Sequence, residues 1–354
     1  MKFRRNEGGR GRTKLVPAAL MLGALLATSC GSDDNAAPAV TDSPAATTSP
    51  SATTGGTIDS GGLPKLWYIN PLTSYELYNT SQKVFEESAS ALGYQAFTAG
   101  SATVDAAEQI TLINQAVAAD ADGIIFCDID PKAYESTIKD AQAKGIVMIT
   151  TGGCIDDISD YSVGTDNVVF GEVAAQTIAD QVGKDAKVVI FGTNESTTNQ
   201  VVIRDGFTAY AAKNFPDMKV LSFQPTNADP AEAATKIAAA VAAYPEATAF
   251  WFIEGAGLSA APSALKQAGM APGDMFLLGV DATPETLASI EDGWVTSTLA
   301  QCFFWATPFA AQLALDTIAG KPAAQQSYSV GVVPVGKGDL PFKGCPDSAY
   351  PSIG

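Results

Sequence analysis

The sequence predicts an α/β protein made of two doubly wound lobes, each built on a parallel sheet. Short apolar runs alternate with segments of helical periodicity along most of the chain, which is typical of strand–helix–strand units in a parallel sheet. The alternation occurs in two runs of similar form, over residues 64–166 and 167–301. The chain has 354 residues, enough for two domains of roughly 100–200 residues each.

Six apolar runs are predicted to be strands buried on both faces, because each is short and rich in aliphatic or aromatic residues. The runs are 66–69, 123–127, 146–149, 187–191, 249–253 and 276–280. Apolar side chains that recur at helical spacing predict helices between them. Three such faces consist of Ile110, Ile113 and Val117, of Tyr134, Ile138 and Ala141, and of Phe170, Ala174, Ile178 and Val182. Strands joined by such helices form parallel sheets with right-handed crossovers.

The residues that end each predicted strand are the first candidates for a functional site. In doubly wound sheets, ligands bind beyond the carboxyl ends of the strands. The residues at these positions are Asn70, Cys127, Asp128, residues 151–153, residues 191–194, Glu254 and Asp281. We therefore expect the site among these residues before any family is considered.

Charge and composition exclude several classes of function. Acidic residues number 38 against 21 basic ones, so nucleic-acid binding would lack its electrostatic driving force. The chain contains no histidine, which excludes Ser-His-Asp triads, Cys-His pairs and HExxH zinc sites. Hydrolytic enzymes are not excluded by composition, but the commonest routes are closed, and our interpretation of the whole sequence is a protein without enzymatic activity, catalytic residue, metal or cofactor. The G-x-G-x-x-A sequence at residues 255–260 is explained by a tight strand-to-helix turn without a bound dinucleotide.

The N-terminal region predicts export. Six basic residues precede an apolar stretch over residues 15–27 that is too short to span a membrane, as in a signal peptide over residues 1–29. The sequence Leu-Ala-Thr-Ser-Cys that ends at Cys30 resembles a bacterial lipobox, which implies cleavage before Cys30 and lipidation of its thiol. Residues 30–63 are almost entirely small or polar, which predicts a disordered tether behind the lipidated cysteine. We expect a protein that is lipid-anchored to the outer face of the cytoplasmic membrane, or periplasmic; ordinary cleavage with free secretion is the alternative.

The other cysteines favour disulfides. Cys127, Cys154, Cys302 and Cys345 include no CxxC pair, and without histidine they make a poor zinc site. Disulfides are common in exported proteins. Cys127 and Cys154 follow neighbouring predicted strands and are candidates to pair with each other, in which case Cys302 and Cys345 would pin the C-terminal tail. Buried thiols are the alternative.

Several short segments carry a resemblance to a known family. Residues 162–167 read Ser-Val-Gly-Thr-Asp-Asn, and residues 279–284 read Gly-Val-Asp-Ala-Thr-Pro. The second segment is followed by Glu-Asp-Gly at 291–293 and by Thr-Leu-Ala-Gln at 298–301. With this order and spacing, the chain from Lys65 to about residue 338 resembles the periplasmic sugar-binding proteins of the ribose-binding type, which are solute receptors of bacterial ABC importers.

The resemblance implies the type 1 periplasmic binding protein fold, in which two lobes joined by a three-strand hinge close on a ligand. The crossings would lie near residues 165–167, Gln301 and Val330. Lobe 1 would contain residues 64–166 plus 302–329, and lobe 2 residues 167–301 plus 330–354. The closed receptor, a monomer held to the membrane by its lipid anchor alone, would be presented to an ABC permease with its cytoplasmic ATPase.

The resemblance also implies a set of ligand-binding residues. Asp281 and Gln301 match the family pattern as hydrogen-bond partners of the ligand, and Glu254 stands where ribose binders usually have asparagine. Tyr75 or Tyr78 would supply an aromatic platform. The full expected set is Asn70, Ser74, Tyr75, Tyr78, Cys127, Asp128, Gly152, Gly153, Glu254, Asp281 and Gln301.

Two departures from the family pattern remove arginine donors. The chain has Gly152 and Gly153 where the family commonly has Asp-Arg, and the arginine of the second lobe aligns near Val201. Arg204 is expected to make a structural ion pair instead. An anionic ligand is therefore disfavoured, because it would need these guanidinium groups.

The carboxylates of the expected site accept hydrogen bonds, and the Gln301 amide both accepts and donates them. These groups favour a neutral sugar or polyol as the ligand. Other functions stay open. An amine could bind carboxylates beside the aromatic side chains Tyr75, Tyr78, Trp251 and Trp305. The closed receptor could engage a sensor kinase instead of a permease. Paired carboxylates such as Glu254 and Asp281 could support glycosidase chemistry, although ligand binding explains the same residues.

Overall fold

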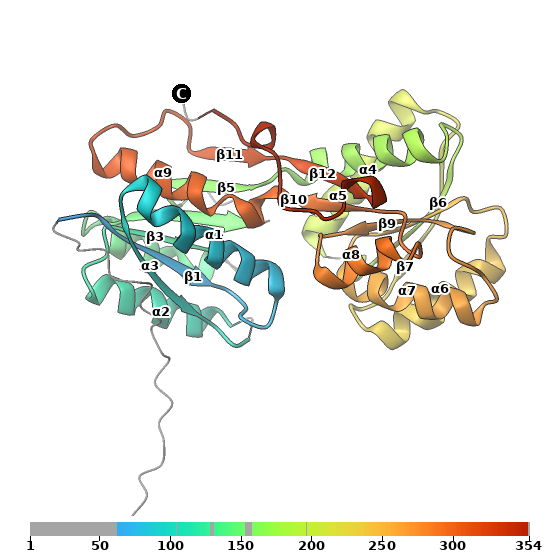
Figure 1. Ribbon diagram of the computed structural model, residues 1–354, viewed down its shortest axis with the longest axis horizontal. Helices are drawn as coiled ribbons and strands as arrows, with labels where there is room; N and C mark the ends of the chain where they lie inside the picture. The colour runs from blue at the N-terminus through green and yellow to red at the C-terminus, as the bar shows by residue number, and fades with distance from the viewer. Residues whose placement is uncertain (1–61, 104, 128–130, 153–157, 196, 353–354) are drawn as a thin grey trace, which may run out of the picture. The chain divides into compact units, whose positions relative to one another are not determined.

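The computed structural model describes residues 62–103, 105–127, 131–152, 158–195 and 197–352, which contain two six-stranded sheets (Figure 1). The first sheet has the strand order β11-β5-β4-β3-β1-β2, and all its strand pairs are parallel. Its strands are β1 (Lys65–Asn70), β2 (Gln95–Gly100), β3 (Gly123–Phe126), β4 (Val147–Gly152), β5 (Tyr161–Thr165) and β11 (Ser327–Val330).

The second sheet has the order β12-β10-β9-β8-β6-β7, and β12 is its antiparallel edge strand. Its strands are β6 (Lys187–Gly192), β7 (Lys219–Pro225), β8 (Ala249–Phe252), β9 (Phe276–Val280), β10 (Ser297–Gln301) and β12 (Val332–Gly336). The predicted fold of two doubly wound sheets is thus confirmed. Each of the six predicted strands is present to within a few residues.

Helices cover both faces of each sheet (Figure 1). On the first sheet, α1 (Glu76–Leu92) and α9 (Thr307–Ile318) pack on one face, and α2 (Ala106–Ala118) and α3 (Pro131–Gln142) on the other. On the second sheet, α4 (Asn167–Gln181) and α5 (Thr198–Asn214) pack on one face, and α6 (Pro230–Ala243), α7 (Gly255–Gln267) and α8 (Pro284–Glu291) on the other. Within the described part of the chain, no helix combines the length and apolar character that a membrane crossing requires.

Local sequence determines where α4 begins and how closely it packs on α5. The Asp166 carboxylate accepts hydrogen bonds from the backbone N–H groups of Val168 and Val169, at 2.8 and 3.2 Å, and so caps the helix. A Cβ atom on Gly171 would lie 2.1 Å from the carbonyl oxygen of Ile203. Glycine is therefore required for this approach of the two helices.

The chain passes between the two sheets at three points, as the predicted hinge requires. The first passage follows β5 and leads into α4, and the second follows β10 and leads into the short 3-10 helix η1 (Cys302–Trp305). The third joins β11 to β12 through Gly331. These passages bring residues from distant parts of the sequence to the same region. Cys302 of the second passage, for example, donates its backbone N–H to the Gly331 carbonyl of the third.

Residues 337–352, which we call the C-terminal strap, contact both sheets. Leu340 packs against the core cluster of the second sheet, whereas Ala349 and Tyr350 pack against a core cluster of the first. The Gly331 N–H donates to the Ala349 carbonyl at 2.7 Å, which ties the strap to the third passage.

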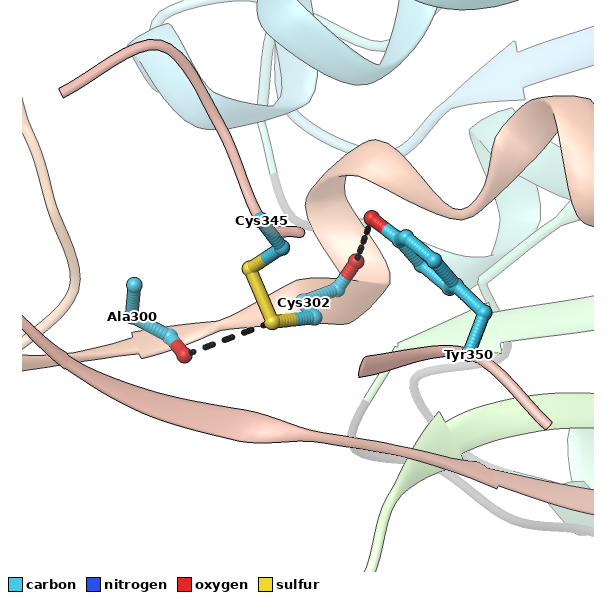
Figure 2. Close-up of a disulfide and its surroundings, with 4 residues drawn as sticks. All are labelled: Ala300, Cys302, Cys345 and Tyr350. Atoms are coloured by element: carbon cyan, nitrogen blue, oxygen red, sulfur yellow. Dashed lines mark hydrogen bonds between the residues drawn. A yellow bond between two sulfur atoms is a disulfide. The ribbon is translucent and has the colours of Figure 1, made fainter. Parts of the chain in front are cut away.

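A disulfide between Cys302 and Cys345 fixes the strap to the second passage (Figure 2). This is one of the two pairings expected from the sequence. The Tyr350 hydroxyl also donates to the Cys302 carbonyl, at 3.4 Å. The other pairing includes Cys154, which lies outside the described residues. The expected lipidation site, Cys30, lies outside them as well.

Candidate ligand-binding site

Asp281 follows β9 directly and is held in a rare backbone conformation. Its φ of +64° lies in the left-handed region, which aspartate tolerates better than most residues. Two bonds to β10 fix the conformation: the Asp281 N–H donates to the Leu299 carbonyl at 2.9 Å, and the Thr298 hydroxyl donates to the Asp281 carbonyl at 2.8 Å. The backbone therefore directs the Asp281 side chain in one defined orientation.

The Asp281 carboxylate accepts two side-chain hydrogen bonds from residues that were both predicted to bind ligand. The Tyr75 hydroxyl donates to Oδ2 at 2.6 Å, and the Gln301 Nε2 donates to Oδ1 at 2.8 Å. These three side chains come from the start of α1, the end of β9 and the end of β10. The structure thus brings Tyr75, Asp281 and Gln301 into one hydrogen-bonded group.

The same contacts shift the acidity of Asp281 and Tyr75. Burial raises the pKa of Asp281, and the hydrogen bonds from Tyr75 and Gln301 oppose that rise only in part. Burial also raises the pKa of Tyr75, and the neighbouring carboxylate raises it further. The Tyr75 hydroxyl therefore keeps its proton and acts as the donor of the pair.

The ring of Tyr75 packs in a cluster of aromatic side chains at the start of α1. The ring centroids of Tyr75 and Tyr78 are 5.7 Å apart, and both rings contact Phe304 of η1, with centroid separations of 6.1 and 5.2 Å. Sequence reasoning missed Phe304. Its place in the aromatic run Phe303-Phe304-Trp305, directly behind the predicted hinge residue Gln301, was the signal that could have identified it.

Asn70 shapes the loop that carries Tyr75. Its side chain is fully buried; Oδ1 accepts from the Leu72 N–H at 3.0 Å, and Nδ2 donates to Asn79 Oδ1 at 3.1 Å. These contacts hold the turn between β1 and α1. Ser74, which was also among the expected ligand residues, is exposed in the same turn.

Glu254 caps helix α7. Its Oε1 accepts from the Thr226 hydroxyl and the Gly257 N–H, both at 2.7 Å, and its Oε2 accepts from the Ala256 N–H at 2.6 Å. A Cβ atom on Gly257 would lie 2.6 Å from the carboxylate, so the second glycine of the G-x-G-x-x-A sequence is needed for this cap. Sequence reasoning missed Thr226 and the cap, because glutamate is not among the preferred N-cap residues.

The ends of β3 and β4 carry two more of the predicted residues. Cys127 is buried directly after β3, and Gly152 ends β4 with a φ of +125°. A Cβ atom on Gly152 would lie 3.1 Å from the Cys127 sulfur, so the two positions are neighbours. Asp128 and Gly153 lie outside the described residues.

Arg204 and Trp251 both have partners within the protein. The Arg204 Nη1 lies 2.8 Å from Glu195 Oε2, and its guanidinium group lies 5.3 Å from the Phe223 ring centroid, so the expected structural ion pair is present. Trp251 is fully buried in the core of the second sheet and stacks on Phe207 at 4.7 Å. It is therefore not available to a ligand.

Comparisons with known proteins agree with this architecture. Residues 67–322 match the family model of the periplasmic binding protein domain. The ribose import binding protein of Bacillus subtilis is 25% identical over 220 residues, which cover 61% of this chain and 70% of that protein. The same-named protein of Salmonella typhimurium is 29% identical over 175 residues, which cover 49% of this chain and 57% of that protein.

Solved structures show the same fold. The structure of an arabinose binding protein from Geobacillus stearothermophilus matches with a TM-score of 0.72 and 20% identity, over 82% of this chain and 100% of that one. A solute binding protein from Burkholderia graminis in complex with D-arabinose matches with a TM-score of 0.68 and 21% identity, over 80% and 98% of the two chains. The chain belongs to the periplasmic binding protein domain family and is similar in sequence to its ribose import binding members.

Proposed function

We propose that this protein is the solute receptor of an ABC importer and that it captures a neutral sugar or polyol. The observation that carries the proposal is the group formed by Tyr75, Asp281 and Gln301, in which a carboxylate and an amide stand beside an aromatic ring. Carboxylates accept from sugar hydroxyl groups, an amide both accepts and donates, and an aromatic ring suits the apolar C–H face of a sugar. The sugar-binding relatives support the same substrate class.

The charges around this group favour an uncharged solute. Neither the side chains bonded to the Asp281 carboxylate nor the described residues that line the pocket beside Tyr75 include a lysine or arginine. Arg204 is engaged by Glu195 at 2.8 Å. A phosphorylated or carboxylated solute would therefore lose its hydration without gaining a cationic partner.

The capture step follows from the position of Tyr75. A hydroxyl group of the solute replaces the Tyr75 hydroxyl at Asp281 Oδ2, while Gln301 keeps its bond to Oδ1. In this scheme the lobes are residues 64–166 plus 302–329 and residues 167–301 plus 330–354, and solute contacts to both favour the closed form. A permease with a cytoplasmic ATPase then receives the solute from the closed receptor, and the protein acts without covalent chemistry.

The proposal also covers the location of the protein and its oligomeric state. A signal peptide over residues 1–29, lipidation of Cys30 and a tether over residues 30–63 would keep a monomeric receptor at the outer face of the membrane, beside its permease.

A thermal-shift screen tests the proposal. The chain from residue 31 onward contains every described residue and is screened against D-ribose, D-arabinose, D-xylose, D-galactose, D-allose, myo-inositol, putrescine, choline and amino acids. A bound solute raises the melting temperature, because it binds the folded state alone. We expect hits among sugars or polyols. Hits confined to amines or amino acids would refute a neutral solute.

A further inference from the structure

A groove between α7 and α8 adjoins the candidate site. It has a volume of about 650 Å³, and we call it the α7–α8 groove. Its apolar wall is formed by Leu72, Leu258, Val280 and Val295, and the hydroxyl-bearing residues Ser259 and Ser289 also line it. The proposed function uses the charge of this lining but assigns no part of the solute to the groove.

The groove is continuous with the group that would hold the sugar. Tyr75, whose hydroxyl lies 2.6 Å from Asp281 Oδ2, lines the groove, and Val280, which precedes Asp281 in the chain, lines it as well. A solute bound to Asp281 could therefore extend past the Tyr75 ring into the groove without crossing the protein core.

The charges of the lining disfavour an anionic occupant. Its charged residues are both acidic, Glu254 and Glu285, which repel an anion. The Glu254 carboxylate already accepts three hydrogen bonds, from Thr226, Ala256 and Gly257, so an ammonium group would have to compete with the cap of α7. The aliphatic side chains instead favour an apolar group, which leaves water when it enters the groove.

We propose that the α7–α8 groove binds the apolar substituent of a glycoside whose sugar ring is held by Asp281 and Gln301. The solute is then an alkyl or aryl glycoside, with its polar ring at the carboxylate and its apolar aglycone against Leu258 and Val295. This inference rests on the proposed sugar-binding function and specifies its substrate class.

Calorimetric titration with paired ligands tests the inference. The ligands are D-ribose, D-xylose, D-glucose and D-galactose, each with its methyl, n-butyl and phenyl β-glycosides. Each fully buried methylene contributes about fourfold in affinity, so burial of two of the three extra methylenes of a butyl group is enough for the butyl glycoside to bind at least about tenfold more tightly than the methyl glycoside. We expect the phenyl glycoside of a sugar that binds to show a similar gain. Butyl and phenyl glycosides that bind no more tightly than the methyl glycoside overturn the inference and leave the proposed function intact. If neither sugars nor glycosides bind, both fail.

A matched pair of variants tests whether the aglycone lies in the α7–α8 groove. Ser259 and Ser263 are exposed serines one turn apart on α7, and only Ser259 lines the groove. Ser259→Trp fills the groove, so we expect it to abolish the roughly tenfold preference for butyl over methyl glycoside while leaving the methyl glycoside within twofold of the wild type. Ser263→Trp should change neither value. Ser289→Phe repeats the test from α8 if Ser259→Trp fails to fold.

Two outcomes would overturn the inference, one by excluding the aglycone from the groove and the other by assigning the groove to another class of ligand. A butyl preference that survives in both Ser259→Trp and Ser289→Phe shows that the aglycone lies outside the groove. Binding of 2-phenylethylamine that is lost in Ser259→Trp but kept in Ser263→Trp assigns the groove to an amine and overturns the glycoside proposal.

Discussion

The Tyr75 hydroxyl donates a hydrogen bond to Asp281 Oδ2 at 2.6 Å, across 206 positions of sequence. Gln301 engages the other carboxylate oxygen at 2.8 Å. Both oxygens of the aspartate therefore have protein donors in the structure. A solute hydroxyl that binds at Oδ2 has to replace the tyrosine, and the Tyr75–Asp281 bond sets part of the free energy of capture.

Tyr75→Phe is expected to tighten solute binding. The variant removes the competing hydroxyl but keeps the ring that packs on Tyr78 and Phe304. A hydrogen bond to a charged group contributes about 1.5–3 kcal/mol, so the affinity should rise by roughly tenfold or more. Calorimetric titration against the solute found in the screen measures the change. Tyr78→Phe is the matched control, and a weaker affinity in Tyr75→Phe would show that the hydroxyl bonds to the solute instead.

Solute affinity should increase as the pH rises through the raised pKa of Asp281. Solute hydroxyl groups donate to the ionised carboxylate, so binding lowers that pKa and releases a proton from receptor molecules that are still protonated. Titrations in two buffers of different ionisation enthalpy measure the released proton. An affinity that is flat between pH 4 and 7 would contradict the assignment, with roughly 4 being the ordinary pKa of an aspartate. In Asp281→Asn this dependence should vanish.

The raised pKa of Asp281 also predicts that the unliganded protein loses stability as the pH rises. The folded state holds the Asp281 proton more tightly than the unfolded chain does, because burial raises the pKa of the folded form. The contribution of Asp281 to the free energy of unfolding is therefore complete below the ordinary pKa of an aspartate, roughly 4. This contribution is lost as the pH rises through the raised pKa of the folded form. Urea unfolding of wild-type protein and Asp281→Asn across this window measures the difference. Asparagine tolerates the left-handed backbone at this position, so the variant should fold.

Glu254→Ala should destabilise the second sheet and its helices. The variant removes the cap of α7, whereas the buried Thr226 hydroxyl loses its carboxylate acceptor but keeps the Gly192 carbonyl at 3.1 Å. Loss of a cap costs about 1 kcal/mol. Denaturant unfolding measures the loss. Glu246→Ala, at an exposed position, is the control, and equal stability of the two variants would show that the cap contributes nothing.

Removal of the Cys302–Cys345 disulfide should lower the free energy of unfolding by up to about 4 kcal/mol, from the chain entropy of a loop of this length. The double variant Cys302→Ser/Cys345→Ser should therefore melt at a lower temperature than the oxidised wild type. A reductant should lower the wild-type melting temperature toward that of the variant and leave the variant unchanged. Equal melting temperatures would show that the packing and the hydrogen bonds of the strap hold it without the disulfide.

Six of the eight interior strands could be predicted from the sequence because their apolar runs are buried on both faces; β5 and β10 were not among the predicted strands. The edge strands β2 and β7 were missed, since most of their residues are only partly buried and lack a continuous apolar run. Asp281 could be predicted because it follows the apolar run of β9, whereas Gln301, the last residue of β10, could be predicted only from the resemblance to the ribose-binding type. Their bond to each other, and that from Tyr75, depends on how two distant loops meet, which no local pattern encodes. The capping role of Glu254 likewise depends on Thr226, 28 residues earlier in the chain.

The most direct test of the account is a calorimetric titration of wild-type protein and Asp281→Asn with the best sugar from the screen. Asparagine keeps the shape of the side chain but removes the charge and one acceptor oxygen. We expect the affinity to fall by about tenfold to a hundredfold, the loss that corresponds to one hydrogen bond to a charged group, with an unchanged fold. Wild-type affinity in Asp281→Asn would contradict the claim that this carboxylate holds the solute.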